Sequence, residues 1–244
     1  MQWLYGVHAL RTLLARSPQR VKRLVIAQQR DDARVREIEA LARTADVRAE
    51  RADVDTLRRM VGNVVHQGVV AEVMPLEPWS EDDLVAACGT ATDPLILALD
   101  GVQDPHNLGA CLRTADACAV LAVVVPKDRA AQVNATVRKV AAGAAETTPV
   151  VAVTNLSRSL KLLKDAGLWV VGADVAGETV AWSADLTGPK VLVMGAEGSG
   201  LRELTRRNCD VLVRLPQLGG VESLNVSVAT GMLLYEALRQ REQS

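Results

Sequence analysis

Residues 95–115 read L-I-L-A-L-D-G-V-Q-D-P-H-N-L-G-A-C-L-R-T-A, an apolar run joined to a helical pattern through a polar loop. The same succession of strand, loop and helix repeats along the rest of the chain. Continuous apolar strands that alternate with helices are typical of a parallel sheet covered on both faces, so we predict an α/β domain. The predicted strands are Leu95–Leu99, Val120–Val125, Val150–Val153, Trp169–Ala173, Val191–Met194 and Val211–Leu215.

The loop after the first of these strands is a candidate site, because ligands of such sheets bind beyond the carboxyl ends of the strands. Pro105 and Gly109 shape a turn there, and Asn107 is in a position to cap the helix that follows. Arg113 lies one to two turns into that helix. We expect Asn107 and Arg113 to face the same loop space; the alternative is a capped helix with one exposed arginine.

A second candidate loop, G-A-E-G-S-G-L at residues 195–201, follows the strand Val191–Met194. Three glycines let a ligand approach the backbone closely. The fingerprint of dinucleotide-binding loops is G-x-G-x-x-G with an acid about 20 residues later. Here the order is G-x-x-G-x-G, and Asp210 lies only ten residues past Gly200. A nicotinamide site is therefore disfavoured.

The third loop runs into the last helix, L-P-Q-L-G-G-V-E-S-L-N-V-S-V-A-T-G-M-L-L-Y-E-A-L, residues 215–238. Ser223 is a candidate cap for this helix. Serine hydrolysis is disfavoured, because the nearest candidate histidine is His106 and no nucleophile elbow is present. The helix predicted from Asn225 to Arg241 is apolar almost all round until Glu236, so it needs a second packing partner beyond one sheet.

Residues 1–74 form a separate small α/β pattern, followed by a linker at residues 75–93 that is rich in proline and acidic residues. The methionine-initiated start lacks the pattern of a secretory signal, and no apolar run is long enough to cross a bilayer. The predicted elements are helices at 6–14, 31–44 and 53–61, strands at 23–27 and 69–73, and a capped helical turn at Ser80–Ala87 within the linker.

Charge is distributed unevenly along the chain, although the net charge is −1. Residues 1–74 carry 13 Lys and Arg against 9 Asp and Glu, whereas residues 75–104 carry 7 acids and no base. This pattern suggests a polyanion-binding module, with Arg16, Arg20, Lys22 and Arg23 as candidate phosphate contacts. The alternative is that these arginines merely solvate surfaces.

The four cysteines, Cys88, Cys111, Cys118 and Cys209, have no CxxC spacing and only three histidines beside them. This disfavours a disulfide framework or a zinc site, and a reducing cytoplasm fits best. Aromatic residues make up 2% of the chain, which disfavours recognition of single-stranded bases chiefly by stacking.

Taken together, three motifs resemble those of the SpoU (TrmH) family of RNA ribose 2′-O-methyltransferases, in the SPOUT superfamily. They are N-L-G-A-C-L-R-T-A, V-M-G-A-E-G-S-G-L and L-P-Q-L-G-G-V-E-S-L-N-V-S-V-A. In addition, Y-G-V-H-A-L at 5–10 and H-Q-G-V-V-A at 66–71 resemble the small RNA-binding domain, similar to ribosomal protein L30e, that precedes many members.

The resemblance implies a domain organisation and a partner set. Residues 1–74 would be the L30e-like substrate-binding domain, and residues 94–244 a catalytic SPOUT domain with a deep trefoil knot, an S-adenosylmethionine site and a homodimer interface. With both parts present, the likeness is greatest to members that methylate a guanosine ribose of 23S rRNA in the peptidyl-transferase region, on an assembly intermediate. A cytoplasmic enzyme that uses no metal, membrane or DNA is expected.

The resemblance also implies site residues. Arg113 would be the catalytic arginine, and Asn107, Glu197, Ser223 and Asn225 would complete the polar site. The positions that hold the cofactor through backbone groups would be Gly195, Leu215 and Leu224.

The chemistry requires alignment of an electrophilic methyl group with a ribose 2′-oxygen and management of one proton. Arg113 would place positive charge beside the developing alkoxide, while an RNA phosphate takes the proton. Direct deprotonation by Arg113 is the alternative, although arginine has a pKa above about 12. Two further functions stay open: methylation of tRNA, and a non-catalytic L30e-type RNA-binding protein.

Overall fold

The computed structural model describes residues 2–198, 200–220 and 223–243. The chain divides into two compact units, each described here by itself. The first comprises Met1–Glu77 with Ala142–Thr147, and the second Pro78–Ala141 with Thr148–Ser244. Within the described residues, no helix is long and apolar enough to cross a membrane.

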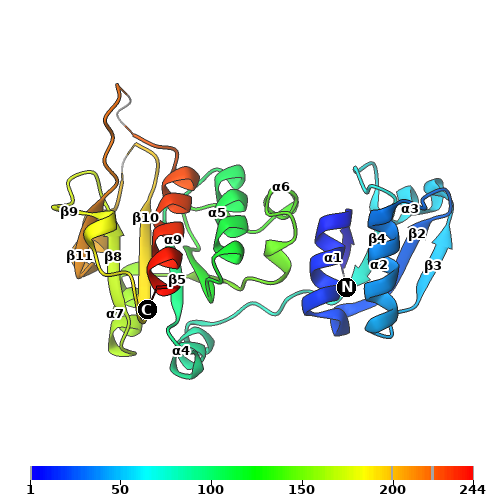
Figure 1. Cartoon of the computed structure of the whole chain (residues 1–244), viewed down its shortest axis with the longest axis horizontal. Helices are drawn as coiled ribbons and strands as arrows, with labels where there is room; N and C mark the ends of the chain where they lie inside the picture. Colours follow the sequence, from blue (N-terminus) through cyan, green and yellow to red (C-terminus); the bar gives the residue numbers. More distant parts are fainter. Residues whose placement is uncertain (1, 199, 221–222, 244) are drawn as a thin grey trace. The chain divides into compact units, whose positions relative to one another are not determined.

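In the described part of the first unit, four strands form one mixed sheet in the order β1-β4-β2-β3 (Figure 1). Strand β4 runs antiparallel to β1 and β2, while β2 and β3 are parallel. The elements are β1 (Gln2–Tyr5), α1 (Val7–Arg16), η1 (Pro18–Arg20), β2 (Val21–Ala27), α2 (Ala33–Thr44), β3 (Ala49–Ala52), α3 (Val54–Val61), β4 (Val69–Val73) and η2 (Ala144–Glu146).

The two faces of this sheet are covered unequally. Helices α1 and α2 bury one face, where Leu10 and Ile38 form a core cluster with Leu24 of β2. The smaller helix α3 covers part of the other face, with Leu57 in a cluster with Val70. Both α2 and α3 begin at an aspartate whose side chain accepts a backbone N–H, as favourable N-caps do.

Two strands of the first unit were not predicted, for different reasons. Strand β3 reads A-E-R-A and lies at the edge of the sheet, so its charged side chains are exposed and leave no apolar signal. Strand β1 is only four residues long and begins next to the chain start. Short edge strands of this kind lack the alternation on which strand prediction depends.

The interpretation of Arg20 as a phosphate contact is wrong. Arg20 is 6% exposed, and its Nε donates to the carbonyl oxygen of Met74 at 3.0 Å. Arg23 is exposed but pairs with Glu50 at 2.9 Å. Lys22 is exposed and forms no ion pair with any described residue.

The second unit begins with a helix where a linker was expected. Helix α4 (Glu81–Thr90) has a complete capping box between Ser80 and Asp83. Its residues Leu84 and Cys88 are buried in the core of the second unit. Most of the predicted linker at 75–93 therefore belongs to the second unit, and two of its side chains lie in that unit's core.

Seven strands of the second unit, as far as its residues are described, form a single parallel sheet. The order is β7-β6-β5-β10-β8-β11-β9, so β10 lies between the earlier strands β5 and β8. The strands are β5 (Leu95–Asp100), β6 (Ala122–Pro126), β7 (Val150–Val153), β8 (Trp169–Ala173), β9 (Thr179–Val180), β10 (Lys190–Gly195) and β11 (Val211–Arg214). The predicted α/β class and parallel sheet are confirmed, and β9 is the strand that was missed.

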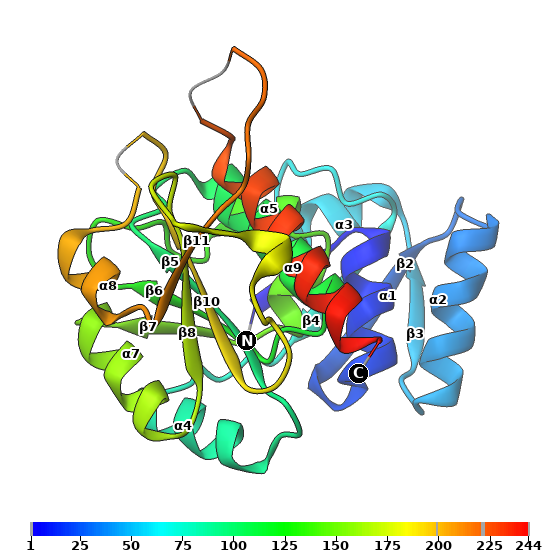
Figure 2. The same ribbon diagram turned by 60° about the vertical axis from the view of Figure 1, so that its left-hand side comes forward.

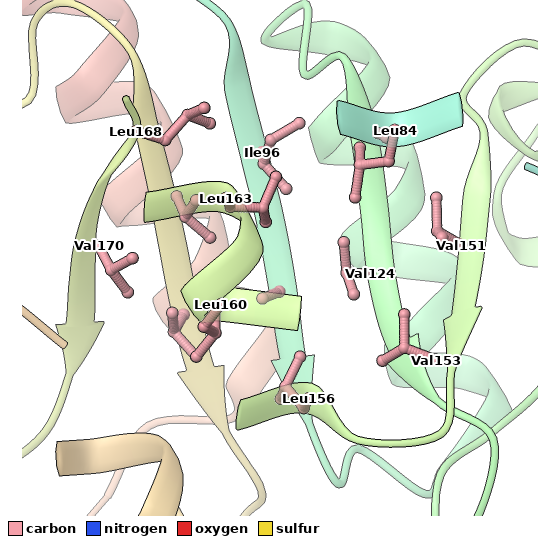
Figure 3. Close-up of a cluster of buried hydrophobic side chains, with 14 of the residues drawn as sticks. Leu84, Ile96, Val124, Val151, Val153, Leu156, Leu160, Leu163, Leu168 and Val170 are labelled. Carbon is pink, nitrogen blue, oxygen red and sulfur yellow. The ribbon is translucent and has the colours of Figure 1, made fainter. Parts of the chain in front are cut away.

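Helices cover both faces of this sheet (Figure 2). On one face, α4 and α7 pack over alternate strand residues such as Ile96, Val124 and Val170, as the labelled cluster in Figure 3 illustrates. On the other face α5 and α9 lie side by side. The helices are α5 (Pro105–Ala117), α6 (Ala135–Val140), α7 (Leu156–Asp165), η3 (Ala181–Ser183), α8 (Glu203–Asn208) and α9 (Val226–Arg241).

The contact between α5 and α9 includes Cys111 and Thr230, whose Sγ and Oγ1 atoms lie 3.6 Å apart. Burial raises the pKa of the Cys111 thiol to about 11, so it packs as a neutral side chain. The far end of α9 is anchored as well. Arg241 donates to the carbonyl oxygens of Leu186 and Asp93, and Gln240 donates to that of Ala184. Contacts with α5 and hydrogen bonds at its far end thus hold α9 in place, and this fixes the position of its first residue.

Candidate active site

A closed glycine loop follows β10 at the carboxyl edge of the sheet. Ala196 and Gly200 exchange two backbone hydrogen bonds, Ala196 N to Gly200 O at 3.1 Å and Gly200 N to Ala196 O at 2.9 Å. A Cβ atom on Gly195 would lie 2.1 Å from the carbonyl carbon of Gly200, so only glycine permits this closure. Gly198 and Gly200 have φ angles of 77° and 65°, the left-handed region that favours glycine.

Glu197 lies in this loop, and one of its carboxylate oxygens collects three hydrogen bonds. Oε1 accepts from Asn225 Nδ2 at 2.6 Å, from Asn107 Nδ2 at 3.0 Å and from the backbone N of Val226 at 3.3 Å. The structure thus brings together one residue from each of the three motifs. Glu197 is thus linked to Asn107, whereas no hydrogen bond or ion pair joins Glu197 to Arg113 in the described chain.

Asn107 reaches this cluster from the first turn of α5. The cap of α5 is Asp104, whose Oδ1 accepts from the backbone N of His106 at 2.8 Å, so the prediction that Asn107 caps the helix is wrong. As the third helical residue, Asn107 is 9% exposed and free to use its amide elsewhere. Its Oδ1 accepts from Asn225 Nδ2 at 3.0 Å.

Asn225 is the N-cap of α9, and both ends of its amide are used. Oδ1 accepts from the backbone N of Ser227 at 2.9 Å and of Val228 at 3.3 Å, while Nδ2 donates to Asn107 and Glu197. Ser223 is therefore not the cap of this helix. It lies exposed two residues upstream of Asn225 and lines the cavity described next.

Beside the glycine loop lies a cavity of about 420 Å³. All three predicted cofactor positions line it, together with two of the predicted polar residues; these are Gly195, Leu215, Leu224, Glu197 and Ser223. A second cavity of about 330 Å³ shares Ala196, Glu197 and Val226 with the first and is also lined by Asn107 and Asp104. The cluster of Asn107, Glu197 and Asn225 therefore lies at the boundary between the two cavities.

Arg113 is separated from this cluster within the chain. Asn107 and Arg113 are six residues apart on α5, which places them about 120° apart around the helix. Asn107 is buried, whereas Arg113 is exposed, lines neither cavity and has no hydrogen bond or ion pair to any described residue. The expectation that the two face the same loop space is therefore wrong for a single chain.

Three polar residues that sequence reasoning missed also line the larger cavity. Asp174 directly follows β8 and pairs with Arg206 at 3.5 Å. Gln217 has a buried Oε1 without a hydrogen-bond partner in the described chain. Asp174 follows a predicted strand at its carboxyl end, and Gln217 belongs to the third motif, so both residues had a signal in the sequence. Arg206 had no such signal.

The described residues contain no cluster of three or more His, Cys, Asp or Glu side chains that could hold a metal ion. The four cysteines are free thiols. Burial is the main cause that raises the pKa of Cys209, to about 12, so this thiol is a poor nucleophile at neutral pH. The polar side chains that line the two cavities offer amide, carboxylate, hydroxyl and guanidinium groups.

A parallel sheet with a closed glycine loop, a polar cluster and a cavity beyond the carboxyl ends of its strands has the arrangement in which α/β proteins bind ligands. Residues 94–235 match the SpoU rRNA methylase family, and residues 3–79 match a family described as RNA 2′-O ribose methyltransferase substrate binding. The chain belongs to the SpoU rRNA methylase family.

Relatives match along almost the whole chain. The 23S rRNA (guanosine-2′-O-)-methyltransferase RlmB of Pseudomonas aeruginosa is 55% identical over 98% of both chains. The protein of the same name from Escherichia coli K12 is 46% identical over 98% of this chain and 99% of its own. Among solved structures, the SpoU methyltransferase AviRb from Streptomyces viridochromogenes in complex with AdoMet is 26% identical, with a TM-score of 0.77, and covers 99% of this chain and 91% of its own.

Proposed function

We propose that this protein transfers a methyl group from S-adenosylmethionine to the ribose 2′-oxygen of a guanosine in 23S rRNA. The observation that carries the proposal is the cluster of Asn107, Glu197 and Asn225 at the boundary of two cavities. Relatives that are 55% and 46% identical over nearly their whole length bear the name of that activity.

The larger cavity fits the cofactor in size and in chemistry. A volume of about 420 Å³ is in the range of sites for small ligands. Met194, Leu215 and Leu224 supply apolar walls for an adenine ring. The unpartnered Oε1 of Gln217 is an acceptor that an N–H or O–H group of the ligand would satisfy. When bound, S-adenosylmethionine supplies an electrophilic methyl group.

The polar cluster is suited to orient a ribose in the smaller cavity. Oε1 of Glu197 accepts hydrogen bonds from Asn225 and Asn107. Its Oε2 has no hydrogen-bond partner in the described chain and can accept one from a ribose hydroxyl. Asn107 has a second amide hydrogen that the cluster leaves unused. Holding the hydroxyl in one orientation is the positioning that the reaction requires.

Arg113 supplies the positive charge in this proposal. Its exposed guanidinium is available to an RNA phosphate and to the 2′-hydroxyl of the same RNA, and stabilises the developing negative charge on the oxygen. The proton passes to the phosphate. Because Arg113 lines neither cavity of its own chain, we infer that it acts at the cavity of a second copy.

The second copy is part of the proposal because α9 has an unpaired apolar face. Val228, Met232 and Tyr235, spaced four and three residues apart on this helix, are 48%, 50% and 68% exposed. Such a stripe on the surface of one chain marks an interface. A symmetric dimer through α9 would cover it.

The first unit is proposed to bind the RNA, and the second to carry out the transfer. Residues 3–79 match a substrate-binding family, which supports this division. The target is proposed to lie in the peptidyl-transferase region of 23S rRNA, on an assembly intermediate in the cytoplasm.

The decisive experiment maps ribose 2′-O-methylation across all rRNA and tRNA in cells that lack this gene, before and after its return. Loss of one guanosine methylation in 23S rRNA, restored by the wild-type gene and not by the Arg113→Ala gene, supports the proposal. Loss confined to tRNA would establish the tRNA alternative instead. An unchanged map would favour a non-catalytic RNA-binding protein.

A further inference from the structure

We propose that Asp100 is a positioning residue that holds the exit of the glycine loop and so fixes Glu197 for the reaction. The proposal rests on the proposed function, because it deepens the assignment of the same site. Asp100 is the last residue of β5, and nothing in the three-motif pattern required a role for it. Its carboxylate is fully buried, with 0% of the side chain exposed.

The geometry ties both ends of the loop to this one residue. In the parallel register Asp100 is the partner of Gly195, where the loop begins. Its Oδ2 accepts a hydrogen bond of 2.9 Å from the backbone N of Arg202, where the loop ends. Asp100 therefore contacts both the residue at which the loop begins and the residue at which it ends.

The guanidinium of Arg202 covers the same carboxylate. Its Nε lies 3.5 Å from Oδ1, an oxygen that has no hydrogen-bond partner in the described chain. A Cβ atom on Gly101 would lie 3.1 Å from Nη2 of the same group, so the guanidinium packs against Gly101. The Arg202 side chain is 49% exposed, so solvent screens this pair, and the 2.9 Å hydrogen bond from Arg202 N is the closer compensation for the buried charge.

The connection from β5 to α5 thus holds the loop at two points. Asp100 holds the exit through Arg202, and seven residues later Asn107 holds Glu197 itself. The Ala196–Gly200 pairing makes the loop a closed unit, so a shift at Arg202 moves Glu197 relative to Asn107 and Asn225. The same shift would deform the cavity wall that Gly195, Gly200 and Leu201 form.

We call the hydrogen bond from Arg202 N to Asp100 Oδ2 the backbone clamp. Two matched pairs of variants separate its effect from that of the charge and packing of the two side chains. Asp100→Ala removes the acceptor, whereas Asp100→Asn keeps an oxygen that can accept from Arg202 N. Arg202→Pro removes the donor, and its φ of −64° already suits proline. Arg202→Ala keeps the donor and loses only the guanidinium.

The first measurement is amide hydrogen exchange of the peptide spanning residues 195–203 in the full-length protein. We expect exchange at least about tenfold faster in Asp100→Ala and Arg202→Pro than in wild type, and within about threefold of wild type in Asp100→Asn and Arg202→Ala. Exchange in α2 should stay unchanged in all four. Equal exchange at 195–203 in Asp100→Ala and wild type would overturn the clamp, whether or not the protein is a methyltransferase.

The second measurement is steady-state methylation with a double-mutant cycle. Asp100→Ala should lower kcat about tenfold or more with little change in KM for RNA, and Asp100→Asn should recover most of the loss. In a Glu197→Gln background the same substitution should cost less than about threefold, because both changes act through Glu197. Fully multiplicative losses would overturn the action through Glu197. Inactivity of wild type on every RNA would instead refute the proposed function and leave the exchange result to stand.

Discussion

Asn225 caps α9 through its Oδ1 and donates through Nδ2 to Glu197 Oε1 at 2.6 Å, so one amide fixes both a helix start and the active-site carboxylate. The two residues are 28 positions apart, and Asn107, which joins them, precedes Asn225 by 118. The cluster therefore forms only when β5, β10 and the start of α9 are assembled at one edge of the sheet. An intact cluster therefore requires these three parts of the second unit to be in place.

Replacement of Glu197 by glutamine should reduce turnover far more than stability. Hydrogen bonds to a charged acceptor are about twice as strong as neutral ones, and the Gln amide can place a donor where Glu197 now accepts. We expect kcat to fall by about tenfold or more, which corresponds to about 1.4 kcal/mol of transition-state stabilisation. The melting temperature should change little, because Glu197 is on the surface.

Glu203→Gln is the matched control for this change. Glu203 makes an exposed pair with Arg207 on α8, and such surface pairs contribute little. Its kcat should equal that of wild type. A parallel fall of melting temperature and kcat in Glu197→Gln would assign Glu197 a structural role.

The apolar strands of the second unit were predictable because both faces of the sheet are covered. Strands β7 and β8 have the predicted bounds, and β5 is one residue longer, since Asp100 is buried at its end without an apolar signal. Helix α4 was underestimated for the opposite reason: its acidic first turn resembles a linker, and only Leu84 and Cys88 reveal burial. The composition of a segment alone does not show which other elements it packs against.

The residues of the candidate site came from the family resemblance, which does not give their hydrogen-bond partners. Residue spacing on α5 could have separated Asn107 from Arg113, since residues six positions apart lie about 120° apart around a helix. The cap at Asp104 was equally visible, because Pro105 follows it at the first helical position. The trefoil knot stays a prediction, because the order of strands in a sheet records neighbours and not the path of threading.

Cofactor binding should survive removal of the first unit if the remaining fragment keeps α4. A fragment of residues 78–244 retains every residue that lines the larger cavity and keeps Leu84 and Cys88 in the core. We expect calorimetry to give an S-adenosylmethionine affinity within about threefold of the full chain, with RNA methylation at least about tenfold slower for lack of phosphate contacts.

A fragment of residues 94–244 is the informative comparison, because it lacks α4. It should melt at a lower temperature, since loss of buried leucine contacts destabilises a core. A folded 78–244 fragment without measurable cofactor affinity would contradict the assignment of the cavity.

The first unit should bind RNA through cations that are not already paired. Lys22 and Arg34 are exposed, and their side chains form no ion pair with any described residue. Replacing both by alanine should reduce the slope of log affinity against log salt by about one to two charge units. The slope comes from filter binding or fluorescence anisotropy at several salt concentrations.

Arg36 offers a paired control, because it forms an exposed bridge with Asp31 at 2.9 Å. Arg36→Ala should change the slope by less than Lys22→Ala. Equal slopes for the double variant and wild type would return Lys22 and Arg34 to the role of solvated surface residues.

Arg113→Lys should lose activity while cofactor affinity is unchanged. Lysine keeps the charge but not the planar fork that contacts a phosphate and a hydroxyl together, so we expect kcat to fall by at least about tenfold. Calorimetry should give the wild-type affinity for S-adenosylmethionine, since Arg113 is proposed to contact the RNA and does not line the cavity of its own chain. Arg158→Lys, on the opposite face of the sheet, is the control. Near-wild-type turnover in Arg113→Lys would exclude a role that needs the guanidinium.

The dimer is the last prediction, and the exposed stripe of α9 is its basis. Met232→Glu combined with Tyr235→Glu places two charges on the stripe, where desolvation would oppose association. Sedimentation at low micromolar concentration should give a dimer for wild type and a monomer for the double variant, with loss of methylation. Leu204→Glu, at a residue 65% exposed on α8, should leave the dimer intact. A fully active wild-type monomer would contradict the interface.

If Arg113 serves the cavity of its partner, mixing Arg113→Ala chains with Glu197→Gln chains should restore activity, because one of the two cavities in each mixed dimer then has both residues intact. Persistent inactivity of the mixed dimer would confine Arg113 to its own chain.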